Sequence, residues 1–327
     1  MAATKGKLKI PAKAFMMQKP MLRVCYALAP LTLAAVYFFG WRALAVTAVV
    51  FLFGVVTEAV FTFPEGKPVT SAVFVTCLVF SLSLPPDIPL WMAAVGIVFG
   101  VAIGKMVFGG FGRNIFNPAM VGRCFIYITF PLQMTGGWTP PLQGGAAGFL
   151  HWSNPIDAVT RSTPLVSLRT GLGFDLLELF LGNVPGSMGE TSALLIILGG
   201  IFLLYLKAAS WRLAAGCLAG GVLAGTLLHL AGIESVPSIL PALLAGSFLF
   251  GMFFVVTEPV TSPNSKTGQL IYGFGIGGLT IILRGFSNFS EGVMFSVLIF
   301  NACAPLIDQV IKEIETRKKT RAARAEN

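Results

Sequence analysis

The stretch "PLWMAAVGIVFGVAIGKMVFG", residues 89–109, decides the fold class of this chain. Lys105 is its only charged side chain, and a helix needs about 20 mostly apolar residues to cross a bilayer. The stretch therefore predicts a membrane-spanning helix rather than the core helix of a soluble domain. Similar apolar runs recur on both sides of it.

Composition extends this prediction to the whole chain. The 327 residues are 55% hydrophobic and 11% charged, with a mean hydropathy of +0.80, whereas a soluble domain carries about 25% charged residues. The alternating pattern of a membrane barrel is missing. We expect an all-α polytopic membrane protein surrounded by lipid, not a nucleic-acid-binding domain.

Ten stretches are long and apolar enough to be candidate spans. They are residues 22–40, 43–60, 69–84, 89–109, 117–133, 192–207, 210–231, 237–256, 268–284 and 290–310. They divide the chain into an N-terminal membrane half with a basic lead-in (1–133), a long loop (134–190) and a C-terminal membrane half with a basic tail (191–327). Five spans on each side of one loop suggest two inverted halves, as in many transport folds.

One internal echo bears on that repeat. "VVTEAV" at 55–60 resembles "VVTEPV" at 255–260. The ten-span topology places both on the same side of the membrane, which inverted halves would not obviously produce. The echo is therefore either chance or a sign of a local error in the span count.

Charge sets the expected orientation. With the N-terminus in the cytoplasm, every lysine falls on the cytoplasmic side, and positive residues favour that side. The arginines expected on the other side are Arg42, Arg161, Arg169 and Arg284. Both termini are thus predicted to be cytoplasmic and the 134–190 loop extracytoplasmic. The basic tail is expected to be a solvated helix end near anionic lipid or a partner.

The cysteines give no sign of a metal centre. Cys25, Cys77, Cys124, Cys217 and Cys303 all fall in apolar runs, and none forms a CxxC pair. We interpret them as small buried hydrophobes and expect no metal site and no iron–sulfur cluster.

The first polar motif is "GGFGRNIFNPAMVGR", residues 109–123. Its glycines allow close approach of a ligand to the backbone, and Arg113 and Asn114 offer donors. Asn117 and Pro118 are typical of an N-cap and a first helical position. A tight turn between helices explains the motif equally well. Arg123, inside an apolar span, is expected to face a cavity or a partner.

The second motif is "TEPVTSPNSKTGQLIYGFGIGG", residues 257–278, which could line a re-entrant or broken segment. Glu258 belongs to it, and Glu58 belongs to its echo. Both carboxylates are candidates to line a cavity or an ion path, together with Arg123. A position at the water interface is the equal alternative.

The third motif is "DAVTRSTPL", residues 157–165, in the long loop. A threonine hydroxyl is a poor nucleophile without activation, but it needs only exposure and a dedicated enzyme to accept a phosphoryl-linked group. Arg161 would then pair with the phosphate, and Asp157 would cap the local turn. The residues alone equally allow a plain loop rich in serine and threonine.

The three motifs together resemble a known family, which contains the RnfD subunit of the Rnf electron-transport complex and the NqrB subunit of the sodium-pumping NADH:quinone oxidoreductase. They are "GGFGRNIFNPA", "DAVTRSTPL" and "TEPVTSPNSKTGQLIYG", in the same order over nearly the whole chain. Chain length favours the Rnf member. The fold that the resemblance implies is similar to that of urea-type channels.

The resemblance implies FMN joined through its phosphate to a threonine in an Asp-x-x-(Ser/Thr)-Gly-Ala-(Ser/Thr) motif. Asp157, Thr160 and Thr163 match its first, fourth and last positions, so Thr163 is the implied attachment residue. Arg161 and Ser162 stand where that motif usually has Gly-Ala. The remaining cofactor-binding candidates are Arg113, Asn114 and Asn117, and a second, noncovalent riboflavin is implied by the quinone-oxidoreductase relative.

The resemblance also implies partners and a location. They are the other Rnf membrane, iron–sulfur and flavin subunits, a flavin transferase, and the inner membrane of a prokaryote. The implied function is electron relay in a ferredoxin:NAD⁺ oxidoreductase coupled to Na⁺ or H⁺ movement, with no catalysis by this chain alone. The rival interpretations are a channel or permease for a small neutral solute, and a purely structural component of the complex.

Overall fold

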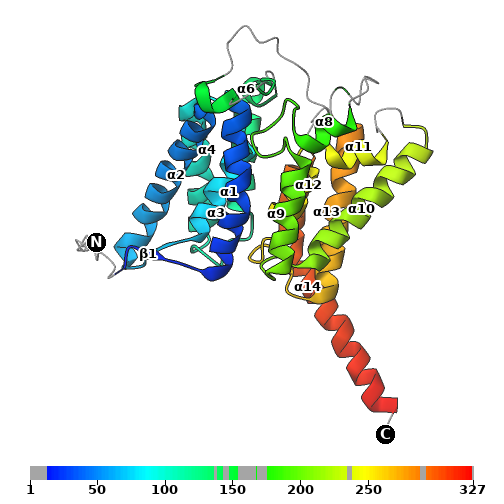
Figure 1. Ribbon diagram of the computed structural model, residues 1–327. Coiled ribbons are helices and arrows are strands. Elements are labelled where there is room, and N and C mark those ends of the chain that lie inside the picture. The colour runs from blue at the N-terminus through cyan, green and yellow to red at the C-terminus, as the bar shows by residue number, and fades with distance from the viewer. Residues whose placement is uncertain are drawn as a thin grey trace.

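The computed structural model describes residues 13–135, 138–142, 147–153, 167, 175–233, 238–287 and 292–325. Figure 1 shows its helices in two groups, one from each part of the chain. Helix α14 (Val293–Ala325) projects from one end of the molecule, which we call the tail end. The opposite end, the loop end, holds the short helices α6 (Pro131–Thr135), α8 (Leu176–Leu181) and α11 (Ile239–Leu244).

The first half contains five helical segments. They are α1 (Lys19–Phe39), α2 (Trp41–Thr62), α3 (Ala72–Leu82), α4 (Leu90–Val101) continued by the π-helical η2 (Ala102–Met106), and α5 (Pro118–Thr129). A 3-10 turn, η1 (Phe63–Glu65), extends α2, and another, η3 (Ala147–Leu150), packs on α1. At the tail end, the two-residue strands β1 (Phe15–Met16) and β2 (Val69–Thr70) pair in parallel.

The second half also contains five segments. The first two are α9 (Ala193–Tyr205) and α10 (Trp211–Leu230). The third segment consists of three consecutive short helices, namely α11, α12 (Phe248–Phe250) and the π-helical η4 (Gly251–Val255). The last two are α13 (Lys266–Phe286) and α14. Helical segments therefore occupy all ten stretches predicted as spans. The long loop contains the short helix α8, and Gly182, with φ +102°, ends it as a left-handed cap.

The helices differ in length more than the sequence suggests. Those long and apolar enough to cross a membrane are α1, α2 with η1, α10, α13 and α14. The shorter α3 has 11 residues and thus spans about 16 Å, roughly half of a bilayer core. The eighth predicted span is broken, because Gly246, with φ +66°, ends α11 before α12 begins.

The contacts between helices have the pattern of inverted halves. Within each half the second segment packs on the fourth, α2 on α4 and α10 on α13. Between the halves, the largest contacts join the two first segments, α1 and α9, and the two last segments, α5 and α14. Contacts between like elements are what a two-fold relation requires. The echo at 55–60 and 255–260 falls on α2 and on η4 with its following turn, which are not equivalent elements, so it does not mark this repeat.

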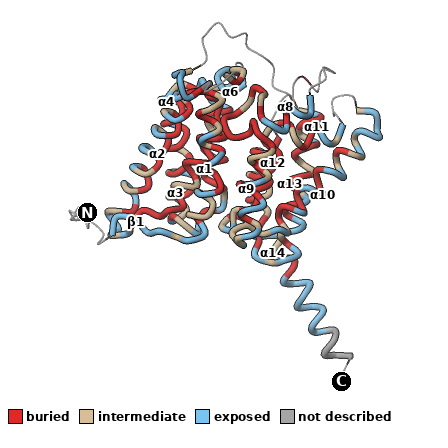
Figure 2. Tube along the Cα trace, viewed as in Figure 1, coloured by how far each residue is buried: buried red, intermediate tan, exposed pale blue. Residues whose placement is uncertain are grey.

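Small residues allow the tightest helix pair. A Cβ added at Gly220 of α10 would overlap the carbonyl oxygen of Phe274, and one added at Gly277 of α13 would overlap that of Cys217. Such close backbone approach is typical of helix pairs in membranes. Figure 2 shows buried residues concentrated toward the inside of the two groups, with exposed residues on the outer faces of helices such as α2 and α10. Many of those exposed side chains are large and apolar, among them Leu52, Val60, Leu223 and Leu227.

Candidate functional site

The proposed attachment motif lies outside the described residues. This applies to every residue predicted from it, namely Asp157, Thr160, Arg161, Ser162 and Thr163. The structure does describe the chain shortly before and after the motif, up to Ser153 and again from Asp175. The described part of the site therefore comprises the scaffold that carries the motif and the polar residues between the two halves.

The glycine-rich motif forms a turn between η2 and α5 at the tail end. Gly109, Gly110 and Gly112 all have positive φ, between +83° and +102°, a conformation that glycine adopts without strain. Asn117 is the N-cap of α5, as predicted, and its side-chain oxygen accepts a hydrogen bond from the Met120 amide at 3.1 Å. Arg113 is exposed.

Asn117 also connects the two halves. Its side-chain nitrogen donates to Glu258 Oε2 at 2.7 Å, and its backbone amide donates to Asn301 Oδ1 at 3.0 Å. Asn301 in turn donates to the Tyr272 hydroxyl at 2.6 Å. Thr261 donates its hydroxyl proton to Glu258 Oε2 at 3.2 Å. One residue of the first half thus holds both a carboxylate and an amide of the second half, with Asn117 and Asn301 buried and Glu258 half-buried.

Glu58 sits in a separate buried cluster within the first half. Its carboxylate is 2.6 Å from Lys105 Nζ, and both side chains are at most 2% exposed. It also accepts hydrogen bonds from the backbone amide and the hydroxyl of Thr70, at 2.9 and 2.6 Å. Removing one partner of such a buried pair costs about 3–5 kcal/mol, because the other charge is left uncompensated.

Two basic residues are not where the charge count placed them. Lys105 was assigned to a cytoplasmic segment and Arg284 to an outside segment, but both are buried. Arg284 donates to the carbonyl oxygens of Ala242 and Ala245 at 2.7 and 3.2 Å, where α11 ends. Carbonyl groups at a helix break need donors inside a membrane, so these cations serve internal structure and carry no information about sidedness.

Lys105 and Arg284 also occupy related places. Each lies near the end of the fourth segment of its half, and each bonds to a residue just before a helix of the third segment: Thr70 before α3, and Ala245 before α12. Within the inverted arrangement they lie toward opposite ends of the molecule. A buried cation therefore fixes the entry to the third segment in both halves.

Arg123 forms an ion pair inside the protein. Its Nη1 donates to Glu190 Oε1 at 3.1 Å, and its Nη2 lies 3.5 Å from Ser187 Oγ. Both side chains of the ion pair are 3% exposed. Ser187 and Glu190 belong to the buried segment 187–192, which precedes α9. Irregular backbone of this kind survives at membrane depth only when protein surrounds it.

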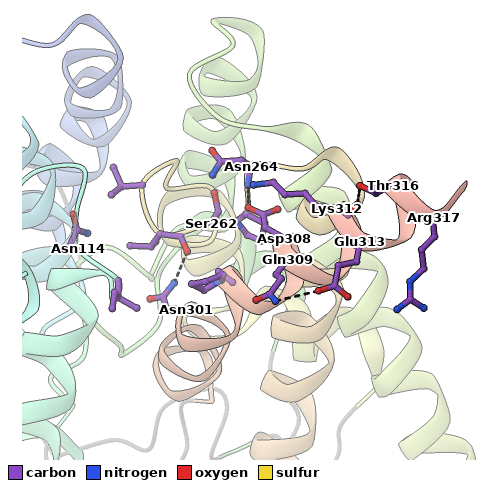
Figure 3. A pocket seen from close by; sticks show the side chains of 16 residues that line it. Asn114, Ser262, Asn264, Asn301, Asp308, Gln309, Lys312, Glu313, Thr316 and Arg317 are labelled. Carbon is purple, nitrogen blue, oxygen red and sulfur yellow. Dashed lines mark hydrogen bonds between the residues drawn. The ribbon is translucent and has the colours of Figure 1, made fainter. Parts of the chain in front are cut away.

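A groove and a small cavity lie next to these residues. The larger, about 770 Å³, is a groove at the tail end between the glycine-rich turn, residues 260–264 and α14. Figure 3 shows Asn114, Asn264, Asn301 and Gln309 along it. The smaller, about 40 Å³, lies between the halves and is lined by Asn117, Glu258 and Thr76, among others. It is large enough for a water molecule.

Sequence reasoning missed several residues of these clusters. They are Lys105, Ser187, Glu190, Tyr272 and Asn301. A signal was available for two of them. Lys105 is the only charge in residues 89–109, and Glu190 is the only charge in "NVPGSMGETSALLIILGG", residues 183–200. An isolated charge in an apolar stretch indicates an internal partner, but the sequence does not say which residue that partner is.

These observations define a class of protein: a polytopic membrane protein of two helical halves, which are joined by polar hydrogen bonds and which each contain apolar helices shorter than a membrane span. The chain belongs to the NQR2, RnfD, RnfE family, whose model matches residues 12–317.

Named relatives agree with this assignment. The chain is 38% identical over 322 residues to the D subunit of the ion-translocating oxidoreductase complex of Stutzerimonas stutzeri, covering 89% of this chain and 90% of that protein. It is 36% identical over 301 residues to the B subunit of the Na⁺-translocating NADH-quinone reductase of Klebsiella pneumoniae (strain 342), covering 89% of this chain and 70% of that protein. The corresponding reductase protein of Yersinia pestis is 38% identical over 302 residues, with 90% and 70% covered.

Proposed function

We propose that this chain is a membrane component of an ion-translocating ferredoxin:NAD⁺ oxidoreductase of the Rnf type, which binds FMN covalently at Thr163 and relays electrons. The observation that carries the proposal is the similarity to an oxidoreductase-complex relative along 90% of that protein's length, against 70% for the quinone-reductase relative from Klebsiella pneumoniae. The family carries flavin, and the motif from Asp157 to Thr163 supplies a hydroxyl that can accept it.

The chain's own residues would hold this cofactor. A bound flavin supplies one- and two-electron chemistry, while the protein sets its position and electrostatics. The Thr163 hydroxyl would form the phosphoester, Arg161 would pair with the phosphate, and Asp157, Thr160 and Ser162 would present the motif to a flavin transferase. The flanking helices α6 and α8 lie at the loop end, which supports a site accessible from outside the membrane.

A second, noncovalent riboflavin is proposed for the tail-end groove. Its volume of about 770 Å³ lies within the usual range for cofactor sites. Asn114, Asn264 and Gln309 offer amide groups to the polar edge of a flavin ring (Figure 3). Asn117 would support the site from behind, since its side chain is already bonded to Glu258. Arg113, which is exposed, has less support as a ligand.

Among the three ion-path candidates, we favour Glu258. It lines the small cavity between the halves, and the side chains that donate to it, Asn117 and Thr261, are neutral. Glu58 and Arg123 are each paired with an opposite charge, which suits a structural role better. Coupling would arise if reduction of a nearby flavin changed the electrostatics between the halves.

The proposed setting is the inner membrane of a prokaryote, with both termini cytoplasmic and the flavin loop outside. Its partners would be the other subunits of the complex. The exposed end of α14 from Lys312 to Thr320, rich in lysine and arginine, suits anionic lipid or a partner.

Mass spectrometry of a peptide covering residues 157–165 tests the main proposal. The expected result is an added mass of FMN less water, located on Thr163. Thr163→Ala should abolish the flavin fluorescence of the denatured protein on a gel, and Thr135→Ala, on α6 and outside the motif, serves as the control that leaves the fluorescence unchanged. Fluorescence that persists in Thr163→Ala would contradict the assignment. Uptake of a neutral solute by the flavin-free protein in vesicles would favour the rival channel.

A further inference from the structure

The chain before the attachment motif is bonded to the corner between α1 and α2. The Trp41 and Arg42 amides, in the first turn of α2, donate to the carbonyl oxygens of His151 and Trp152 at 3.1 and 2.8 Å. The Trp41 indole donates to the Phe149 carbonyl at 2.9 Å. The first amides of a helix have no partner within it, and the N-cap of α2 is Gly40, which has no side chain to supply one. The loop backbone therefore caps α2.

Two glycines make this contact possible. A Cβ added at Gly148 would overlap the carbonyl oxygens of Val36 and Tyr37, near the end of α1. A Cβ added at Gly40 would lie 2.7 Å from the carbonyl oxygens of both His151 and Trp152. The loop and the corner thus touch backbone to backbone, and we call this contact the entry clamp (residues 36–42 with 148–152).

The same corner is tied to the next loop of the first half. Arg42 donates from its guanidinium to the carbonyl oxygens of Pro86, Asp87 and Ile88, at 3.2, 3.0 and 3.1 Å. Partial burial raises the pKa of the Asp87 carboxyl, and the neighbouring Arg42 opposes that shift. The entry clamp is therefore bonded to the loop between α3 and α4 and is not an isolated turn.

The chain after the motif is bonded to the same half. The Met188 and Gly189 amides donate to the carbonyl oxygens of Leu84 and Leu82, at 3.0 and 2.7 Å, where α3 ends. One residue further on, Glu190 is paired with Arg123 of α5. A Cβ added at Gly189 would lie 2.6 Å from the Leu82 Cβ. We call this contact the exit clamp (residues 187–190 with 82–84 and Arg123).

We infer that the two clamps fasten both ends of the flavin-bearing loop to the first half, and that Gly148, Trp41 and Glu190 are positioning residues for the covalent flavin. This inference rests on the proposed attachment at Thr163. The helix between the clamps, α8, packs on α9 and α11 of the second half.

Gly148→Ala in the intact complex tests the entry clamp. Flavin attachment requires only that the motif be exposed, so the covalent flavin content should stay unchanged. Electron transfer through the complex should fall by about tenfold or more, because a misplacement of about 1 Å already weakens catalysis strongly. Iodide should quench the flavin fluorescence more readily than in the unaltered complex, which a general loss of stability with retained flavin would not predict.

Gly186→Ala is the matched control on the same loop. A Cβ added there meets no atom within 4 Å, so rate and quenching should equal those of the unaltered complex. Trp41→Phe, which removes one donated hydrogen bond, should show the same changes as Gly148→Ala to a smaller degree. If the Gly148→Ala protein fails to accumulate, Trp41→Phe alone tests the entry clamp. Gly148→Ala or Trp41→Phe behaving like Gly186→Ala would overturn the inference. Absence of flavin at Thr163 in the unaltered chain would instead refute the proposed function.

Discussion

At the scale of single residues, this protein buries a few of its charged side chains and gives each of them a partner inside the protein. Glu58 with Lys105 and Glu190 with Arg123 are buried ion pairs, while Arg284 is bonded to carbonyl oxygens. The desolvation of such charges is expensive, so a buried pair is weak evidence of net stability but strong evidence that neither partner can be removed alone.

Lys105→Met should therefore lower the free energy of unfolding by about 3–5 kcal/mol, since Glu58 loses its counter-charge. The double variant Glu58→Leu with Lys105→Met should recover most of that loss, because no buried charge remains. Thermal unfolding of the purified protein in detergent measures both. If the double variant is as unstable as the sum of the two single variants, the pair is not coupled as described.

Asn117 has two roles that substitution can separate. Asn117→Ser keeps an N-cap for α5 and loses the bond to Glu258, whereas Asn117→Ala loses both. We expect both variants to reduce electron transfer by the complex, and only Asn117→Ala to lose a further ~1 kcal/mol of stability from the missing cap. Activity and unfolding measured side by side test this. Full activity of Asn117→Ser would show that the bond between the halves is dispensable.

At the scale of elements, close packing and helix breaks give each half its shape. The α10–α13 pair depends on glycines whose backbones touch the facing helix. In contrast, α3 is followed by a Pro85-Pro86 pair. The π-helical turns η2 and η4 end the fourth segment of the first half and the third segment of the second half. Such turns often occur at functional sites, and here they lead into the two polar motifs.

Gly277→Ala should destabilise the protein by about 1–3 kcal/mol, because the added methyl group overlaps the Cys217 carbonyl and the helices must separate. Gly278→Ala is the neighbouring control. Its nearest new contact, with the Gly220 carbonyl oxygen, is an ordinary 3.6 Å, and alanine is the better helix former. Equal unfolding midpoints for the two variants would contradict the packing described.

The ten helical stretches were predictable from the sequence, because long apolar runs leave few other structures at membrane depth. The Asn117 cap and the glycine turn were predictable too, since each depends on local chemistry. The break after α11 and the burial of Lys105 were not, because they are decided by residues distant in sequence. The environment of Thr163 remains a prediction.

At the scale of the whole molecule, α1 begins and α14 ends at the tail end, while α6, α8 and α11 lie at the loop end (Figure 1). An even number of crossings requires this arrangement of the termini. Which end faces the cytoplasm is predicted from charge alone. The burial of Lys105 and Arg284 does not change that prediction, because it removes one positive residue from the count on each side of the membrane.

Labelling with a membrane-impermeant maleimide tests the orientation. Leu177→Cys places an exposed thiol on α8 at the loop end, and Lys319→Cys places one on α14 at the tail end. In intact cells we expect only the cysteine at position 177 to react, and after lysis both. Reaction of the cysteine at 319 in intact cells would reverse the orientation and would place the tail, rather than the flavin loop, outside.

The strand pair at the tail end has a practical consequence for anyone who handles this protein. Phe15 and Met16 pair with Val69 and Thr70, and the Gln18 amide donates to Ser71 Oγ at 2.8 Å. Thr70 also donates to the buried Glu58 carboxylate. Trimming the chain up to the start of α1 would therefore unpair the strand that supports an internal charge. A purification handle belongs instead at the far end of α14, where side chains from Lys312 to Thr320 are exposed.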